Sequence, residues 1–225
     1  MSVIFTRAPL RISLGGGGTD LPSYYEEHGG YLLSGAIDKY IYMLTHTVFQ
    51  QRYRMKYSET EEVDDPKDIK HPILRETLLR HWRGNPLEIA SVADVPAGTG
   101  MGSSGAFTVG LIKGLALAKR MSITPGDLAE AACRIEIDVL NEPVGKQDQY
   151  VSAHGGICAY TFNADGSVDV QPVELDESTL RRLRHNLLLF YTGEARSASR
   201  ILGDQVKRTT ESDPAMVDNL HRTKA

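Results

Sequence analysis

Glycines and serines suited to binding phosphate gather at residues 96–107, which read PAGTGMGSSGAF. Four glycines in eight residues cannot form a stable helix or strand, whereas residues 106–120 are helical in composition. The chain therefore passes from a flexible loop into a helix N-terminus, where unpaired N–H groups and the helix dipole favour an anion. Ser103 and Ser104 add hydroxyls that could cap the helix, contact phosphate or bind a metal ion. Capping alone needs fewer glycines, so the sequence favours phosphate binding.

Three common phosphate-binding loops do not fit this stretch. A Walker loop needs Gly-Lys-Ser/Thr, and no lysine stands at that place. Gly100, Gly102 and Gly105 match G-x-G-x-x-G, but a dinucleotide-binding fold next requires a strand that ends in an acid about 20 residues further on. Residues 124–127 open a second helix instead. A protein kinase would need His-Arg-Asp and Asp-Phe-Gly downstream, and neither occurs.

Three acidic residues are candidates for handling a metal ion, a proton or a ligand hydroxyl. Glu136 falls roughly 80° from Leu128 at about 100° per helical residue, which places it at the margin of an apolar face, where a salt bridge is the ordinary role. Asp148 lies in the polar segment 141–150, which we expect to be a turn, and Asp20 follows four glycines. Asp20 could cap a short helix or bind a ligand. We favour the ligand, because glycines suit a molecule pressed against backbone.

The elements that would position these residues come as strands first and then packed helices with a hairpin, an order typical of an α+β fold. Residues 3–14 and 31–48 are rich in strand-forming residues, the first stretch interrupted by Pro9. Residues 87–95 predict a strand that leads into the glycine-rich loop. Residues 50–70 are so polar that we expect an exposed excursion.

Helices dominate the second half of the chain. Residues 103–120 are apolar nearly all round and predict a buried helix, and Thr124 caps the next helix with Pro125 at its first position. The remaining predicted elements are a helix at 71–83, a hairpin of 156–162 and 167–173, a strand at 185–191 and a helix from 197 onwards.

Composition argues against several classes of function. The chain has 225 residues, is 41% hydrophobic and carries a formal net charge of −4, so it can bury a real core and suggests neither nucleic acid nor an anionic membrane as a partner. It opens without the apolar run of a signal peptide, and Cys133 and Cys158 match no disulfide framework or metal spacing, so we expect a cytoplasmic protein. The histidines show no metal-ligand spacing, and Ser103 lacks the partners of a hydrolase triad.

Three stretches resemble motifs of the GHMP kinases, the family of galactokinase, homoserine kinase, mevalonate kinase and phosphomevalonate kinase. Residues 96–106 resemble the second motif, P-x-x-x-G-L-G-S-S-A-A, with Met101 for Leu and Gly105 for the first Ala. Residues 7–22 resemble the first motif, and residues 145–149 resemble the Gly-x-Met-Asp-Gln segment of galactokinase. The GGGGTDLP version of the first motif is similar to that of the heptose-phosphate kinases and fucokinases within the family.

The resemblance implies a site for ATP, Mg²⁺ and a phosphorylated sugar. Mg²⁺ would bind Ser104 and Glu136, because Glu136 precedes Asp148 by 12 residues as the corresponding Glu does in galactokinase. Asp148 would accept the proton of the attacking hydroxyl or orient it, and Arg11 would keep Asp148 ionised and help to neutralise the transferring phosphoryl group. The implied ATP-binding residues are Pro96, Gly98, Gly100, Gly102, Ser103, Ser104 and Gly105. The implied sugar-binding residues are Gly17, Gly18, Thr19, Asp20 and Lys146.

Two of these positions bear on which sugar is bound. Gly17 and Gly18 replace a Glu-His pair that reaches the sugar in galactokinase, which argues against galactose itself. Lys146 has no counterpart in galactokinase. It could be a solvated surface lysine or could contact a second phosphate on the substrate, and the sequence leaves both open.

On this resemblance the chain has the GHMP kinase two-domain α+β fold, a mixed sheet packed with helices. The ATP-binding N-terminal domain would span 1–184, and 185–225 would begin a truncated C-terminal domain, because the family's third, glycine-rich motif is absent. The implied reaction transfers the γ-phosphate of ATP to the anomeric hydroxyl of a heptose 7-phosphate. An octose-phosphate kinase, a fucokinase and a non-catalytic fragment that binds ATP or a sugar stay open as alternatives, as does the oligomeric state, including a dimer.

Overall fold

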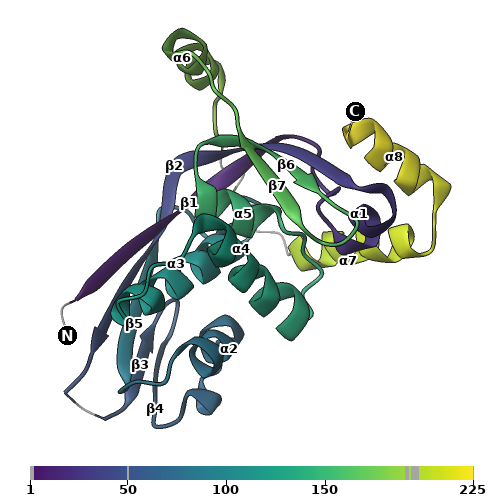
Figure 1. The fold of residues 1–225 in the computed structure, drawn as a ribbon. Helices are drawn as coiled ribbons and strands as arrows, with labels where there is room; N and C mark the ends of the chain where they lie inside the picture. Colours follow the sequence, from purple (N-terminus) through teal and green to yellow (C-terminus); the bar gives the residue numbers. More distant parts are fainter. Residues whose placement is uncertain (1–2, 50, 191–192, 194–197, 225) are drawn as a thin grey trace.

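A computed structural model describes residues 3–49, 51–190, 193 and 198–224 of the chain. Its described part is built on one mixed sheet with the strand order β4-β3-β5-β2-β6-β7, and β1 pairs with β2 (Figure 1). The strands are β1 (Ile4–Gly15), β2 (Gly30–Thr47), β3 (Tyr53–Lys56), β4 (Thr60–Val63), β5 (Leu87–Ala93), β6 (Ile157–Phe162) and β7 (Val168–Pro172). The helices are α1 (Pro22–His28), α2 (Pro72–His81), α3 (Ser103–Ala118), α4 (Pro125–Cys133), α5 (Gln147–His154), α6 (Glu177–Asn186), α7 (Ala198–Thr210) and α8 (Pro214–Lys224), with a 3₁₀ turn η1 (Pro66–Asp68) and a π-helical turn η2 (Arg134–Val139).

The long strand β2 organises the sheet. It pairs with β1 along most of its length, with β5 near its end and with β6 near its start, all antiparallel. The sequence predicted an interruption of β1 at Pro9, but the strand continues, with only a register shift between Pro9 and Arg11. An edge strand tolerates proline because the missing N–H is not needed by the ladder.

The polar stretch 50–70 contributes strands β3 and β4 to the sheet, so it is not an excursion from the fold, although most of residues 51–70 are exposed as expected. Tyr53 and Met55 alternate with charged residues and are buried, and Ile69 is buried as well. The charged residues between them pair on the other face, as the contact of Lys56 with Glu88 at 2.6 Å shows. The charges masked a period-2 strand pattern, because Arg54 and Lys56 pair with carboxylates on the neighbouring strands.

Helix α3 is buried under the sheet, as its composition predicted, and packs against β1 and β2 beside α4 and α5. Thr124 caps α4 by accepting from the N–H of Asp127, and β6 and β7 form the predicted hairpin. The segment 141–150 is not simply a polar turn, because α5 begins at Gln147 and holds Asp148 in its first turn. This helix start brings Asp148 against the core.

The predicted strand at 185–191 is not present in the described part of the chain. Residues up to Asn186 belong to helix α6, and residues 187–190 form neither strand nor helix; residue 191 lies outside the described residues. Leu188 and Phe190 are 77% and 78% exposed. A strand needs a neighbour for its N–H and C=O groups, and among the described residues none pairs with this segment.

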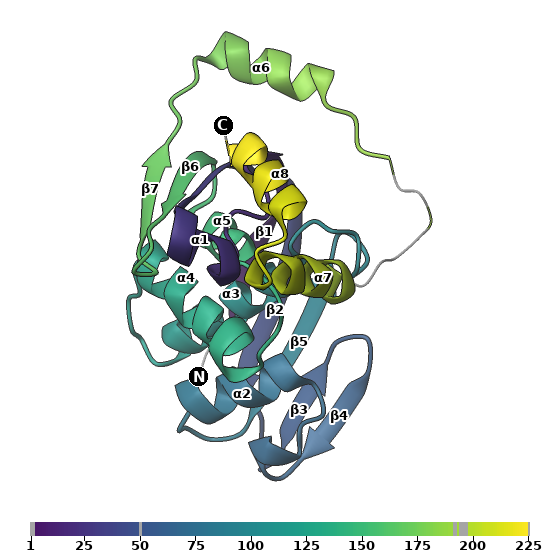
Figure 2. The same cartoon turned by 90° about the vertical axis from the view of Figure 1, so that its right-hand side faces the viewer.

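Helices α7 and α8 follow as predicted from residue 197 onwards. Helix α7 packs against α1 and α8 packs against β2, whereas α6 stands apart from the body in both views (Figures 1 and 2). Within the described residues, no helix is both long and apolar enough to cross a membrane.

Candidate active site

The glycine-rich loop joins β5 to α3 and docks on the outer edge of β1. The N–H of Arg11 donates to Met101 O at 3.1 Å, and Arg11 Nη1 donates to Gly100 O at 2.7 Å. Gly98, Gly100 and Gly102 have φ values of 77°, 74° and 77°, a conformation that other residues adopt only with strain. The loop shape therefore requires these glycines.

The N-terminus of α3 is open to a ligand. Gly102 is its N-cap residue and no side chain accepts a hydrogen bond from the first turn, so the capping role considered for Ser103 and Ser104 does not apply. The first N–H groups of a helix lack partners within it, and they carry the positive end of its dipole. This end of α3 can receive phosphate.

Ser104 and Glu136 lie together beside this helix end. Ser104 Oγ donates to Glu136 Oε2 at 2.5 Å, and Gln149 Nε2 donates to Glu136 Oε1 at 3.0 Å. Glu136 is only 1% exposed, so its predicted place at the margin of the buried face was wrong. It lies in the π-helical turn η2, where the wider turn breaks the count of 100° per residue. Burial raises the pKa of Glu136, opposed by its hydrogen bonds to Ser104, Gln149 and Thr108.

Arg11 and Asp148 form an ion pair at the same place. Arg11 Nε and Nη2 lie 2.7 Å and 2.5 Å from Asp148 Oδ1, and both side chains are partly exposed. Gly102 and Gly105 pack against Asp148 so closely that a Cβ on Gly105 would lie 2.7 Å from Asp148 Cβ. The structure therefore brings the predicted base, its arginine and the glycine-rich loop into direct contact.

Two of the residues expected to bind the sugar, Thr19 and Asp20, have side chains that are buried in the protein. Thr19 is fully buried and its hydroxyl lies 2.7 Å from Gly16 O. Asp20 is 6% exposed and its carboxylate accepts from the N–H groups of Gln147 and Gly18. Burial raises the pKa of Asp20, since it outweighs these hydrogen bonds. Buried polar groups need hydrogen-bond partners, and these two side chains find theirs within the protein. They therefore stabilise the turn at residues 16–20 and do not line an open surface.

Lys146 is neither solvated nor free to reach a substrate, so both roles considered for it need correction. It is 9% exposed, and its ammonium donates to Glu130 Oε1 at 2.9 Å and to Gly166 O at 2.6 Å. A buried ammonium requires such partners, and these lie on α4 and on the hairpin turn. Lys146 therefore ties the start of α5 to the hairpin.

A cavity of about 580 Å³ beside the glycine-rich loop escaped prediction from the sequence. Its wall contains Ser103, Ser104 and three aromatic rings: His71 stacks on Phe107 with centroids 5.0 Å apart, and Tyr57 meets His71 edge-on at 4.8 Å. Tyr57 belongs to the stretch expected to be exposed, which is why the cavity was missed. Such a cavity suits a flat heterocycle.

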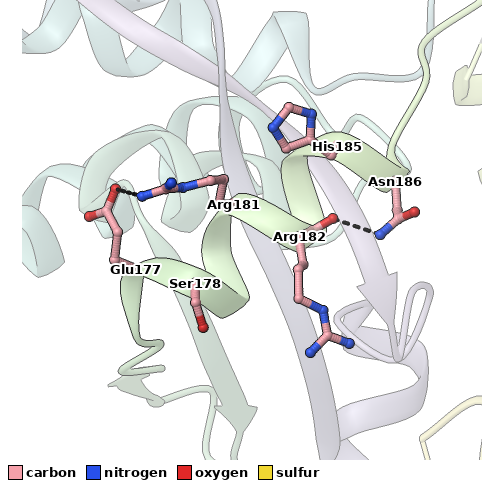
Figure 3. A pocket seen from close by; sticks show the side chains of 6 residues that line it. All are labelled: Glu177, Ser178, Arg181, Arg182, His185 and Asn186. Carbon is pink, nitrogen blue, oxygen red and sulfur yellow. Dashed lines mark hydrogen bonds and ion pairs between the residues drawn. The ribbon is translucent and has the colours of Figure 1, made fainter.

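A second hollow lies along helix α6 (Figure 3). The side chains in it come from one exposed helix, and its visible contacts are Arg181 with Glu177 and Asn186 with Arg182 O. None of the predicted site residues lies there. We assign no function to this hollow.

The site therefore combines a glycine-rich loop at a helix N-terminus, a carboxylate beside a serine and an Asp–Arg pair, an arrangement suited to phosphoryl transfer. Residues 71–156 match the family described as GHMP kinases N terminal domain. This part of the chain thus matches the family whose motifs the sequence resembles, and the mixed sheet packed with helices is the α+β class that the sequence predicted.

Known proteins similar to this chain include several sugar kinases. It is 28% identical over 237 residues to D-glycero-alpha-D-manno-heptose 7-phosphate kinase of Campylobacter jejuni subsp. jejuni, covering 100% of this chain and 69% of that protein. It is 25% identical to the bifunctional fucokinase/GDP-fucose pyrophosphorylase of Arabidopsis thaliana, covering 95% of this chain and 22% of that protein. A crystal structure of a D-glycero-D-manno-heptose 1-phosphate kinase from Bacteriodes thetaiotaomicron has a TM-score of 0.78 at 22% identity, covering 97% of this chain and 76% of that one, which shows a shared fold.

Proposed function

We propose that this chain is an ATP-dependent sugar kinase that phosphorylates the anomeric hydroxyl of a heptose 7-phosphate to give the 1,7-bisphosphate. The observation that carries the proposal is the meeting of two pairs at the start of α3: Ser104 with Glu136, and Arg11 with Asp148. The similarity to a heptose 7-phosphate kinase over the whole chain supports the choice of sugar.

In this proposal the phosphates of ATP lie against the N–H groups of the loop at 98–105. The adenine enters the cavity beside it and lies against the wall that carries Tyr57, His71 and Phe107. Binding through backbone N–H groups and the helix dipole holds the γ-phosphate in place, and phosphoryl transfer depends mostly on such positioning and charge neutralisation.

Ser104 and Glu136 fit a magnesium ion. Glu136 is buried, yet no ion pair with a lysine, arginine or histidine is recorded for it in the described part of the chain. A buried carboxylate without a cation is costly, and two oxygen ligands are typical of a magnesium ion that keeps several waters. When bound, Mg²⁺ would neutralise charge on the β- and γ-phosphates.

Asp148 takes the proton of the attacking hydroxyl or orients that hydroxyl toward the γ-phosphate. Arg11 holds the Asp148 carboxylate in place through contacts from two of its nitrogens. A new bond forms between the sugar oxygen and phosphorus, and the bond between phosphorus and the β–γ bridging oxygen breaks to release ADP. The sugar lies over the backbone of Gly17 and Gly18, while Asp20 fixes that turn.

The remaining parts of the proposal concern the setting of the enzyme. We assign residues 1–184 to the ATP-binding domain and 185–225 to the start of the second domain. ATP and a sugar phosphate are its small-molecule partners, without nucleic acid or membrane. The cytoplasm, where ATP and sugar phosphates are available, is its compartment.

The test is Asp148→Asn, compared with the wild-type chain in a kinase assay and in calorimetry with ATP. We expect phosphoryl transfer to be lost while the dissociation constant for ATP changes little, since within the described residues the hydrogen bonds of the Asp148 carboxylate come from Arg11 and not from the loop N–H groups. Near-normal turnover in this variant would remove Asp148 from its role. ATP binding without any turnover by the wild-type chain would favour the non-catalytic fragment.

A second candidate acceptor is fucose, because a fucokinase domain is among the similar proteins. A screen of sugars and sugar phosphates with a free anomeric hydroxyl separates the two. We expect a higher kcat/KM for heptose 7-phosphate than for fucose, and the reverse order would reassign the substrate.

A further inference from the structure

Gln149 contacts Glu136 beside Ser104, although no role was predicted for it from the sequence. It lies in the first turn of α5 directly after Asp148 and is 1% exposed. Its Nε2 donates to Glu136 Oε1 at 3.0 Å, whereas its Oε1 is buried with no hydrogen-bond partner. This amide therefore has one end fixed and one end open.

The chemistry of Glu136 determines which atom of the Gln149 side-chain amide is left without a hydrogen-bond partner. A carboxylate only accepts hydrogen bonds, so the NH₂ group of Gln149 must face Glu136 and the amide oxygen must face away. An amide oxygen that is buried without a partner costs about 1–3 kcal/mol. A ligand that donates a hydrogen bond would remove that cost.

The contact also fixes Glu136 before any ligand arrives. Ser104 on α3 donates to one oxygen of the Glu136 carboxylate and Gln149 on α5 donates to the other. Glu136 is therefore held between the helix that begins at the phosphate-binding loop and the helix that carries Asp148. A shift of Gln149 would change the direction of this carboxylate.

We propose that Gln149 is a positioning residue of the metal subsite. Its Nε2 holds the Glu136 carboxylate, and its Oε1 accepts a hydrogen bond from a water molecule bound to the metal ion. The inference rests on the proposed function, which places Mg²⁺ on Ser104 and Glu136. Magnesium keeps several of its waters in proteins, so an acceptor beside its ligands has a partner available.

Gln147 provides a matched control for Gln149. It lies on the other side of Asp148 in the same helical turn and is 6% exposed. Its Nε2 donates to Ser34 Oγ at 3.2 Å, away from Glu136. Gln149→Met and Gln147→Met each remove one buried hydrogen bond at nearly constant volume, and only the first one touches the metal subsite.

The experiment measures the affinity for Mn²⁺, a paramagnetic substitute for Mg²⁺, by electron paramagnetic resonance with a saturating non-hydrolysable ATP analogue. We expect Gln149→Met to weaken Mn²⁺ binding roughly 10–100-fold, the range for partners that orient metal ligands, and Gln147→Met to change it by less than about threefold. In the kinase assay, high Mg²⁺ should restore the rate of Gln149→Met without a change in the KM of the sugar. Circular dichroism checks that each variant is folded.

The outcomes separate the two proposals. A wild-type chain that binds no Mn²⁺ with the nucleotide analogue contradicts the proposed function itself. A wild-type chain that binds Mn²⁺, with Gln149→Met equal to Gln147→Met, overturns the role of Gln149 alone. If Gln149→Met does not fold, NMR of the wild-type chain decides: addition of Mg²⁺ to the analogue-bound chain should shift the side-chain amide of Gln149 and leave that of Gln147 in place. An unmoved Gln149 amide would overturn the proposal.

Discussion

The substitution Gly105→Ala tests how closely α3 and α5 pack at Asp148. An added Cβ would lie 2.7 Å from Asp148 Cβ, 2.9 Å from its carbonyl carbon and 3.0 Å from Gln149 N, all inside the 3.4 Å where ordinary contact begins. Two of these atoms are backbone and cannot rotate away. Helix α5 must therefore move by roughly 0.7 Å relative to α3, a shift large enough to matter for transfer geometry.

The expected magnitudes differ for stability and for catalysis. Overpacking typically costs about 1–3 kcal/mol, and alanine recovers about 1 kcal/mol through its better helix propensity, so the net loss of stability is at most about 2 kcal/mol. A misplacement near 1 Å costs on the order of 100-fold in rate, so kcat should fall by roughly that factor. The same contact gives a physical reason for glycine where the family's second motif has alanine.

Gly110→Ala in the same helix is the control. Its added Cβ would lie 3.5 Å from Met43 Cγ and 3.6 Å from Ala8 Cβ, which are ordinary contacts. We expect it to raise stability by up to about 1 kcal/mol and to leave kcat unchanged. The assay is steady-state ADP release with the sugar phosphate, with thermal unfolding of each variant. A kcat for Gly105→Ala equal to that of Gly110→Ala would refute the packing argument.

Three further predictions follow from the site. Arg11→Lys removes the two-nitrogen contact with Asp148 and the hydrogen bond to Gly100 O. It should lower kcat by on the order of 10-fold or more in steady-state kinetics, because an ammonium group cannot reproduce the guanidinium fork. An unchanged kcat would contradict this prediction. In the metal-free chain, the raised pKa of Glu136 contributes stability that is present below its unfolded value of 4.5 and is lost as pH rises through its folded value. The free energy of unfolding of wild type, measured with denaturant, should therefore fall relative to that of Glu136→Gln as the pH rises above 4.5. Parallel curves would argue against a buried, ionising Glu136. Lys146→Met should destabilise the chain by about 1–3 kcal/mol while the KM of the sugar phosphate stays within about twofold; a large rise in that KM would restore its predicted phosphate contact.

The parts of the fold that sequence could predict are those where local chemistry decides. Thr124 before Pro125 specified a capped helix, and the turn before residue 167 specified a hairpin, because capping and turn residues act over a few positions. The two strands within 50–70 were missed because charged residues there pair across strands, which is a long-range property. The strand predicted at 185–191 failed for the opposite reason: its composition suits a strand, but the described residues offer it no neighbour.

The candidate site divides in the same way. The motifs indicated Arg11, Ser104, Glu136 and Asp148, and the structure brings them together in two contacting pairs. The burial of these side chains was harder to predict. A π-helical turn buries Glu136, whereas a regular helix would have left it at the margin of the apolar face. The buried ammonium of Lys146 depends on partners on α4 and the hairpin, which no local pattern could reveal.

The most direct test of the account is a crystal structure of the chain with a non-hydrolysable ATP analogue and Mn²⁺, with an anomalous map to locate the metal. We predict triphosphate density along residues 98–105 and a single anomalous peak in contact with Ser104 and Glu136, on the same side of α3 as Asp148. A nucleotide bound elsewhere, or a metal peak remote from Glu136, would contradict the claim that these residues form one phosphotransfer site.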